Sequence, residues 1–264
     1  MTASAPGAVP PARLAVPLGA KTEADTIEVN RVLAPVTALG PGRRLGLWVQ
    51  GCSLRCPGCA SRDTWLRGGG TTVAVTELAA DLADRVEAGS LTGLTVTGGE
   101  PLDQAPALKR LIIEWRGRLA PPRSARAPRA ERTPQPPKPQ PPKPQRPKPE
   151  PPAPEGQLDV LLFTGYTASA AKRKAGTLWG ELDAVVAGPY RRDLPSDEPL
   201  VASSNQELLR LDPAWEPGPG GRMQVMALDG ELVMVGLPRP GDLDRLEASL
   251  RQRGVTFGGA SWRS

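Results

Sequence analysis

The chain has 264 residues, a formal net charge of +5 and three cysteines, and it contains no histidine. Without histidine, imidazole is excluded as a metal ligand, as the general base of a serine or cysteine nucleophile and as a proton shuttle. Three closely spaced cysteines do not form a framework of paired disulfides, and no segment reaches the roughly 18 consecutive apolar residues of a membrane span. The sequence therefore predicts a cytoplasmic protein without a membrane segment.

Composition divides the chain into segments. Residues 121–154 contain 15 of the 32 prolines and eight Lys or Arg against two Glu, so this tract carries the basic charge and the remainder is near neutral. We interpret the tract as a disordered, solvated spacer, with docking to a partner as the alternative, and not as a nucleic-acid groove. The expected segments are a flexible N-terminus (1–25), a first part of the core (26–120), the insert (121–157), a second part of the core (158–254) and a C-terminal tail (255–264).

The first part of the core alternates short apolar runs with helical periods. Residues 45–49 and 94–97 read as buried strands because they are continuously apolar or nearly so. Apolar residues at helical spacing predict helices over 76–89 and 103–117, each with its first residue, Thr76 or Asp103, as the N-cap.

The second part continues the same alternation after the insert. Residues 160–163 and 184–187 are short apolar runs, as in parallel strands covered on both faces. Residues 223–235 contain two apolar stretches broken by Asp229-Gly230, which predicts a hairpin, and Leu243, Leu246 and Leu250 predict a last amphipathic helix. The order indicates an α/β fold with a mostly parallel sheet.

Unusual residues follow the predicted strands. Cys52 follows the first strand, Gly98-Gly99-Glu100 the second, Gly165-Tyr166 the third and Gly188-Pro189-Tyr190 the fourth. Because the carboxyl ends of parallel strands gather ligand-binding loops at one edge, we expect these residues to face one cavity.

The three cysteines lie in GCSLRCPGCA, residues 51–60, with the spacing C-x3-C-x2-C. Three thiolates in one loop can hold three irons of a 4Fe-4S cluster and leave the fourth iron open to another ligand. A zinc site would want a fourth ligand, for which Asp63 is the nearby candidate, and three unligated structural thiols are the other alternative. Thiolate softness and the number of ligands favour the cluster.

The sequence resembles the radical S-adenosylmethionine superfamily at this point, and within it the small activating enzymes of glycyl radical proteins, nearest to those of anaerobic ribonucleotide reductase. The most specific block is GPGRRLGLWVQGCSLRCPGCASRDTW at residues 40–65. TGGEPL at 97–102, LLFTGYT at 161–167 and Ser204-Asn205-Gln206 resemble further blocks in the same order. The resemblance covers about residues 26–240 apart from the insert.

This resemblance implies a partial (β/α) barrel of the radical S-adenosylmethionine type and a set of site residues. Gly98, Gly99 and Glu100 match the loop that receives the methionyl amino group, whose ammonium needs acceptors close to the backbone. The implied ligands of the cluster are Cys52, Cys56 and Cys59.

Three further residues are weaker candidates. Arg43 would steer the methionyl carboxylate or simply cap its loop. Tyr166 and Asn205 would line the cavity, although a packed tyrosine and an ordinary capping asparagine are equally consistent with the sequence.

The resemblance also implies the chemistry. A one-electron donor such as flavodoxin or ferredoxin would reduce the cluster, and S-adenosylmethionine would be cleaved to methionine and a 5'-deoxyadenosyl radical that removes a hydrogen from a glycine of a protein partner. Two alternatives stay open: a radical enzyme acting on a small molecule or peptide, and a non-catalytic iron-sulfur binding or sensing module.

Overall fold

The computed structural model describes residues 24–119, 158–218, 221–228 and 230–255. The expected insert (121–157) lies outside this range, as do nearly all of the N-terminal segment and the C-terminal tail. Strands and α-helices follow in the order β1 (Thr26–Val36), β2 (Arg44–Val49), β3 (Thr71–Ala74), α1 (Val75–Gly89), β4 (Gly93–Gly98), α2 (Ala105–Leu119), β5 (Asp159–Thr164), α3 (Ala168–Ala175), β6 (Ala184–Ala187), β7 (Glu207–Arg210), β8 (Met223–Leu228), β9 (Glu231–Gly236) and α4 (Asp242–Gln252). Every helix in the described part of the chain is too short or too polar to cross a membrane.

A seven-stranded sheet organises the molecule, with strand order β3-β1-β2-β4-β5-β6-β7. Strands β2, β4, β5 and β6 are parallel neighbours, whereas β1 pairs antiparallel with both β2 and β3, and β7 pairs antiparallel with β6. The predicted α/β class with a mostly parallel sheet is confirmed. Because the four central strands run the same way, the loops that leave their carboxyl ends meet at one edge.

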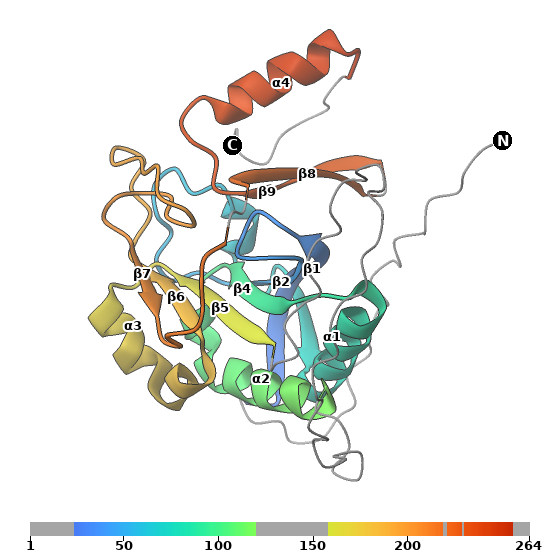
Figure 1. The fold of residues 1–264 in the computed structure, drawn as a ribbon, viewed down its shortest axis with the longest axis vertical. Coiled ribbons are helices and arrows are strands. Elements are labelled where there is room, and N and C mark those ends of the chain that lie inside the picture. The colour runs from blue at the N-terminus through green and yellow to red at the C-terminus, as the bar shows by residue number, and fades with distance from the viewer. Residues whose placement is uncertain (1–23, 120–157, 219–220, 229, 256–264) are drawn as a thin grey trace, which may run out of the picture.

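The two faces of the sheet have different covers. Side chains on one face, among them Leu47, Val96 and Leu162, form the main core with the apolar sides of α1 and α2. On the other face, Trp48 packs with residues of the β8–β9 hairpin, including Val235. Figure 1 shows the hairpin on the side of the sheet away from α1 and α2, with α4 beyond it. The hairpin thus covers the face of the sheet opposite the helices.

The continuous apolar runs predicted as strands are all present, and the hairpin and the last helix are confirmed. Both predicted N-caps are wrong. Helix α1 begins at Val75 with Ala74 in the N-cap position, because β3 leads directly into it. Asp103 lies within a short 3-10 helix, Pro101–Gln104, that is capped by Glu100 and precedes α2. The second helix also extends to Leu119, two residues beyond its predicted end.

Candidate functional site

The cysteine loop, residues 50–66, leaves the carboxyl end of β2 and closes on itself. The N–H of Gly51 donates to the carbonyl of Thr64 at 2.8 Å, and that of Cys52 donates to the carbonyl of Trp65 at 3.1 Å. The buried Gln50 side chain also donates from Nε2 to the carbonyl of Leu66, at 2.7 Å. These bonds fix both ends of the loop to the edge of the sheet, so the segment that carries the thiols has a defined position.

All three cysteines are reduced and half-buried, and their side chains line one cavity of about 610 Å³. Backbone N–H groups point at two of the sulfurs: Arg55 donates to Cys52 Sγ and Ser61 to Cys59 Sγ, each at 3.4 Å. Burial raises the pKa of the Cys52 and Cys59 thiols, and these N–H groups act in the opposite sense. Such donors favour the thiolate, which is the form that binds metal.

The predicted glycine loop packs directly against the cysteine loop. The N–H of Gly99 donates to the carbonyl of Val49, and the N–H of Glu100 donates to the carbonyl of Gly51, each at 2.9 Å. Gly98 has φ +102°, and a Cβ on Gly99 would come within 2.1 Å of the Gly51 carbonyl oxygen. Glycine is therefore required by a close approach of two backbones, which brings Gly98 and Glu100 to the wall of the same cavity as the thiols.

Glu100 is almost fully buried at this wall. Its carboxylate accepts hydrogen bonds from Leu102 N at 3.0 Å, Thr164 Oγ1 at 2.8 Å and Gly165 N at 2.9 Å. Burial raises its pKa to about 7, although the three hydrogen bonds oppose this shift. The carboxylate therefore joins the end of β4 to the end of β5 and presents a titratable group to the cavity.

The other three predicted residues do not line the cavity. Arg43 is exposed at the amino end of β2, the opposite end from the cysteine loop, and its carbonyl accepts the N–H of Thr92 at 2.7 Å. Asn205 donates from Nδ2 to the carbonyl of Pro189 at 2.8 Å, while its Oδ1 is buried without a hydrogen-bond partner among the described residues. The structure thus separates Arg43 from the site and makes Asn205 a support for the loop that follows β6.

Tyr166 belongs to a polar cluster that braces the start of the cysteine loop. Its hydroxyl lies 3.1 Å from Ser53 Oγ and 3.3 Å from Asp103 Oδ1. Asp103 accepts both the N–H and the hydroxyl of Ser53 at 3.0 Å and forms an ion pair with Lys174 at 3.1 Å. We call Ser53, Asp103, Tyr166 and Lys174 the brace. Sequence analysis missed this role for Asp103 and Lys174, because the partners come together only in the folded sheet.

Sequence analysis also missed two further parts of the cavity wall, one from β9 and one from the side chain of Gln206. The β9 strand and the turn after it line one side, with Val233, Val235 and Leu237 among the residues that also pack on the inner face of the sheet. On another side Gln206 donates from Nε2 to the carbonyl of Gly188 at 3.0 Å, which holds the loop after β6 beside the thiols. The Ser204-Asn205-Gln206 block pointed to this region, although the neighbour of the predicted residue is the one that lines the cavity.

The thiols fit an iron-sulfur cluster by their chemistry and placement. They lie in one loop, they line one cavity and backbone N–H groups point at two of them. Within the described ranges, no three His, Cys, Asp or Glu side chains converge closely enough to hold a single ion. A cluster does not require such convergence, because each thiolate binds a different iron.

These features define an α/β protein with a three-cysteine loop and a glycine loop at the carboxyl edge of its sheet. Residues 38–123 match the family described as a 4Fe-4S single cluster domain. The chain is 26% identical over 179 residues to the anaerobic ribonucleoside-triphosphate reductase-activating protein of enterobacteria phage T4, a match that covers 67% of this chain and 90% of that protein.

A second relative matches over a shorter span. The pyruvate formate-lyase-activating enzyme of Staphylococcus aureus (strain USA300) is 41% identical over 81 residues, which cover 30% of this chain and only 32% of that enzyme. Among solved structures, QueE from Escherichia coli superposes with a TM-score of 0.32 and 13% identity over 54% of each chain. The predicted resemblance to activating proteins is confirmed by the phage and staphylococcal relatives.

Proposed function

We propose that this protein is a radical S-adenosylmethionine activating enzyme that forms a glycyl radical on a partner protein. The observation that carries the proposal is the shared cavity, where the three thiols meet the Gly98–Glu100 loop at the carboxyl edge of the sheet. Cys52, Cys56 and Cys59 would hold a 4Fe-4S cluster with one open iron. The cluster and S-adenosylmethionine, when bound, supply reductive cleavage of the sulfonium to methionine and a 5'-deoxyadenosyl radical.

The glycine loop would receive the methionyl ammonium through acceptor groups. The N–H groups of Gly99 and Glu100 are already donated to Val49 and Gly51, so backbone carbonyls and the Glu100 carboxylate are the groups suited to a cation. An ammonium beside Glu100 would lower the pKa of its carboxylate from about 7 and favour the charged form. The loop would thus combine a fixed backbone with a carboxylate that ionises as the ligand binds.

The roof of the cavity would protect the radical. Trp48, Val233 and Val235 make an apolar layer between the sheet and the hairpin, which limits the access of water to the thiol side of the cavity. Exclusion of water and of side reactions is the contribution expected of a protein around a reactive intermediate.

The test is anaerobic reconstitution with iron and sulfide, followed by addition of S-adenosylmethionine and dithionite and chromatography of the products. We expect 5'-deoxyadenosine from the wild type and from Ser249→Ala, an exposed site on α4, and none from Cys56→Ser. A wild-type protein with a full cluster that releases no 5'-deoxyadenosine would exclude the proposed activity. Anaerobic ribonucleotide reductase is the first partner to test, by electron paramagnetic resonance of the radical, because the phage relative is named for activating that enzyme.

A further inference from the structure

The cysteine loop has a second hollow on its outer side. This groove, of about 600 Å³, is lined by the loop tip and by the segment after β6, namely Leu54, Cys56, Pro57, Pro189, Tyr190, Arg191, Arg192 and Asp193. Four of these residues, Leu54, Cys56, Tyr190 and Arg192, also line the inner cavity. Cys56 therefore lies where the inner cavity and the outer groove adjoin.

Both sides of the groove are preformed. Gly58 has φ +78°, and a Cβ there would lie 3.4 Å from Arg192 Cδ and 3.6 Å from Tyr190 Cε1, so the loop packs closely beneath the opposite wall. That wall is held by side-chain bonds from Asn205 to the carbonyl of Pro189 and from Gln206 to the carbonyl of Gly188. These bonds maintain the groove without a bound partner.

The groove combines an apolar floor with a basic rim. Leu54, Pro57 and Tyr190 supply apolar surface, whereas Arg191 and Arg192 on the opposite wall are exposed. Arg55 does not line the groove, but it is exposed between the lining residues Leu54 and Cys56 and adds a charge beside the rim. Among the described residues that line the groove, Asp193 alone is acidic, and Arg191 is paired with it at 2.6 Å.

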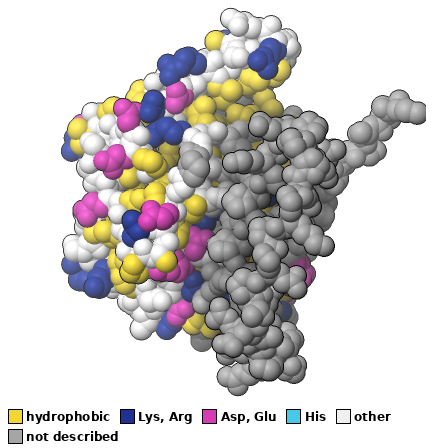
Figure 2. Space-filling model, in the orientation of Figure 1, with side chains coloured by type: hydrophobic (Ala, Val, Ile, Leu, Met, Phe, Trp, Pro, Cys, Tyr) yellow, Lys and Arg dark blue, Asp and Glu magenta, His cyan; other side chains and the backbone are white. Residues whose placement is uncertain are grey.

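Figure 2 shows Lys and Arg side chains, with Asp and Glu between them, among hydrophobic ones on the upper part of the molecule, below α4. With Arg191 neutralised by Asp193, Arg55 and Arg192 leave the rim with an excess of positive charge. An acidic surface would complement this rim.

We propose that the outer groove, residues 54–57 and 189–193, is the docking site of an acidic one-electron carrier protein. This inference rests on the proposed function, because it requires an electron acceptor behind Cys56. In each productive encounter the reduced carrier loses one electron and the site behind Cys56 gains it; no bond is formed or broken between the two proteins.

The shape and charge of the groove suit a carrier better than a stable partner. Transient redox encounters use small interfaces, and their association depends on charges at the rim. The polypeptide substrate, in contrast, must place a reacting atom inside the inner cavity, which has further walls from β9 and the Gly98–Glu100 loop that the outer groove lacks. The groove therefore delivers electrons, and the substrate enters elsewhere.

The first experiment measures binding of a purified acidic flavodoxin to the full chain by fluorescence titration at low and high salt. The test variant Arg55→Glu/Arg191→Glu reverses one charge beside the rim and one in the wall of the groove. The matched control, Lys172→Glu/Arg173→Glu, makes the same change in charge on exposed residues of α3 that do not line the groove. We expect the test variant to weaken binding at low salt by about tenfold or more and the control to bind as the wild type does.

Asp193→Asn should have the opposite effect on flavodoxin binding from the test variant, because it frees Arg191 from its ion pair. This variant should bind flavodoxin more tightly than the wild type at low salt, and high salt should reduce the difference. Equal losses in the test and control doubles, or weaker binding by Asp193→Asn, would overturn the docking site.

The activity readout separates this inference from the proposed function. With dithionite, 5'-deoxyadenosine formation should be the same in the wild type and the control; with reduced flavodoxin as the donor, the test variant alone should be slowed. If the wild type makes no product with dithionite, the proposed function fails, whatever the binding data show. If the test variant loses as much of the dithionite-driven reaction as of the flavodoxin-driven one, the rim supports the loop or the substrate, and the docking inference fails.

Discussion

Glu100 shows how one residue links the geometry of the site to pH. Its carboxylate is 1% exposed and has a pKa of about 7, against an ordinary value of 4.5, because burial disfavours the charged form. Between these two values the folded protein keeps a proton that the unfolded chain has released. The contribution of the protonated Glu100 to the free energy of unfolding is therefore fully present below pH 4.5 and is lost as the pH rises through about 7.

Glu100→Gln should remove this dependence. A shift of this size corresponds to on the order of 3 kcal/mol, so the unfolding free energy of the metal-free wild type should fall relative to that of the variant between pH 4.5 and pH 7. Urea unfolding of both proteins over this range measures the difference, with Glu87→Gln, exposed on α1, as the control. Parallel stability curves for the wild type and Glu100→Gln would show that the carboxylate does not titrate in this way.

At the scale of elements, the brace connects the cysteine loop to the 3-10 helix and to α3. Burial alone would raise the pKa of Asp103, but hydrogen bonds from Ser53 and Lys174 outweigh it and lower that pKa. The contribution of ionised Asp103 to the free energy of unfolding is therefore present when the pH is above 3.8, the ordinary pKa of an aspartate. It is lost as the pH falls through the lowered pKa of Asp103 in the folded protein.

Asp103→Asn should loosen the cysteine loop while the sheet stays folded. Hydrogen bonds to a charged group contribute about 1.5–3 kcal/mol each. Asparagine removes the negative charge that pairs with Lys174, and its amide nitrogen cannot accept the Ser53 N–H that Asp103 Oδ2 accepts. We expect less iron per chain after anaerobic reconstitution and gel filtration, with little change in circular dichroism. Asp84→Asn, exposed on α1, is the control; an iron content equal to the wild-type value in Asp103→Asn would rule out the bracing role.

The elements that sequence analysis found and those that it missed differ in burial. Strands β2 and β6 are buried along their whole length, so each reads as an apolar run. Strands β3 and β7 are the edges of the sheet and expose polar residues, and β1 mixes buried and exposed positions, so none of these three has a clear pattern.

The residues of the site also divide into those that the sequence pattern reveals and those that it does not. Its cysteine and glycine loops are contiguous in sequence and were predicted as blocks, whereas the brace joins Asp103 to Ser53, 50 positions away. Periodicity carries no information about such a pairing. Only the fold brings these residues together.

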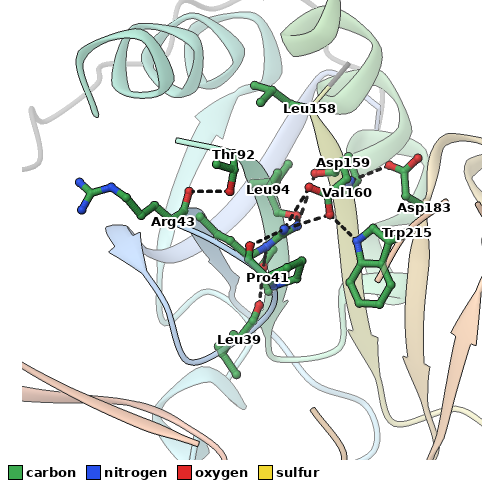
Figure 3. Close-up of polar contacts among 12 residues, drawn as sticks. Leu39, Pro41, Arg43, Thr92, Leu94, Leu158, Asp159, Val160, Asp183 and Trp215 are labelled. Atoms are coloured by element: carbon green, nitrogen blue, oxygen red, sulfur yellow. Dashed lines mark hydrogen bonds and ion pairs between the residues drawn. The ribbon is translucent and has the colours of Figure 1, made fainter. Parts of the chain in front are cut away.

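At the scale of the whole molecule, one end of the central strands carries the site and the other end stabilises the fold. The carboxyl end carries the loops of the site, and the amino end is closed by a buried ion pair between Arg44 on β2 and Asp159 on β5, at 2.9 Å. Arg44 is fully buried and also donates to Thr95 Oγ1 at 2.6 Å and to the carbonyl of Leu94 at 2.8 Å. Figure 3 shows its neighbour Arg43 pointing away from this network.

Substitutions of these two adjacent arginines should therefore differ in their effect on the free energy of unfolding. Arg44→Met leaves the Asp159 carboxylate without its cation and should lower the free energy of unfolding by about 3–5 kcal/mol, whereas Arg43→Ala should change it by less than about 0.5 kcal/mol. Denaturant unfolding of the two variants measures both values. Because the pair lies at the end of the sheet opposite the thiols, folded Arg44→Met should still bind iron as the wild type does.

Arg43→Ala also tests the role that the sequence suggested for this residue. If Arg43 held the methionyl carboxylate, its loss would raise the KM for S-adenosylmethionine in the dithionite-driven reaction. An exposed side chain at the amino end of β2 is too remote from the cavity for that contact, so we expect the KM to stay at the wild-type value. A higher KM with unchanged stability would require the carboxylate to bind away from the cavity that holds the three thiols.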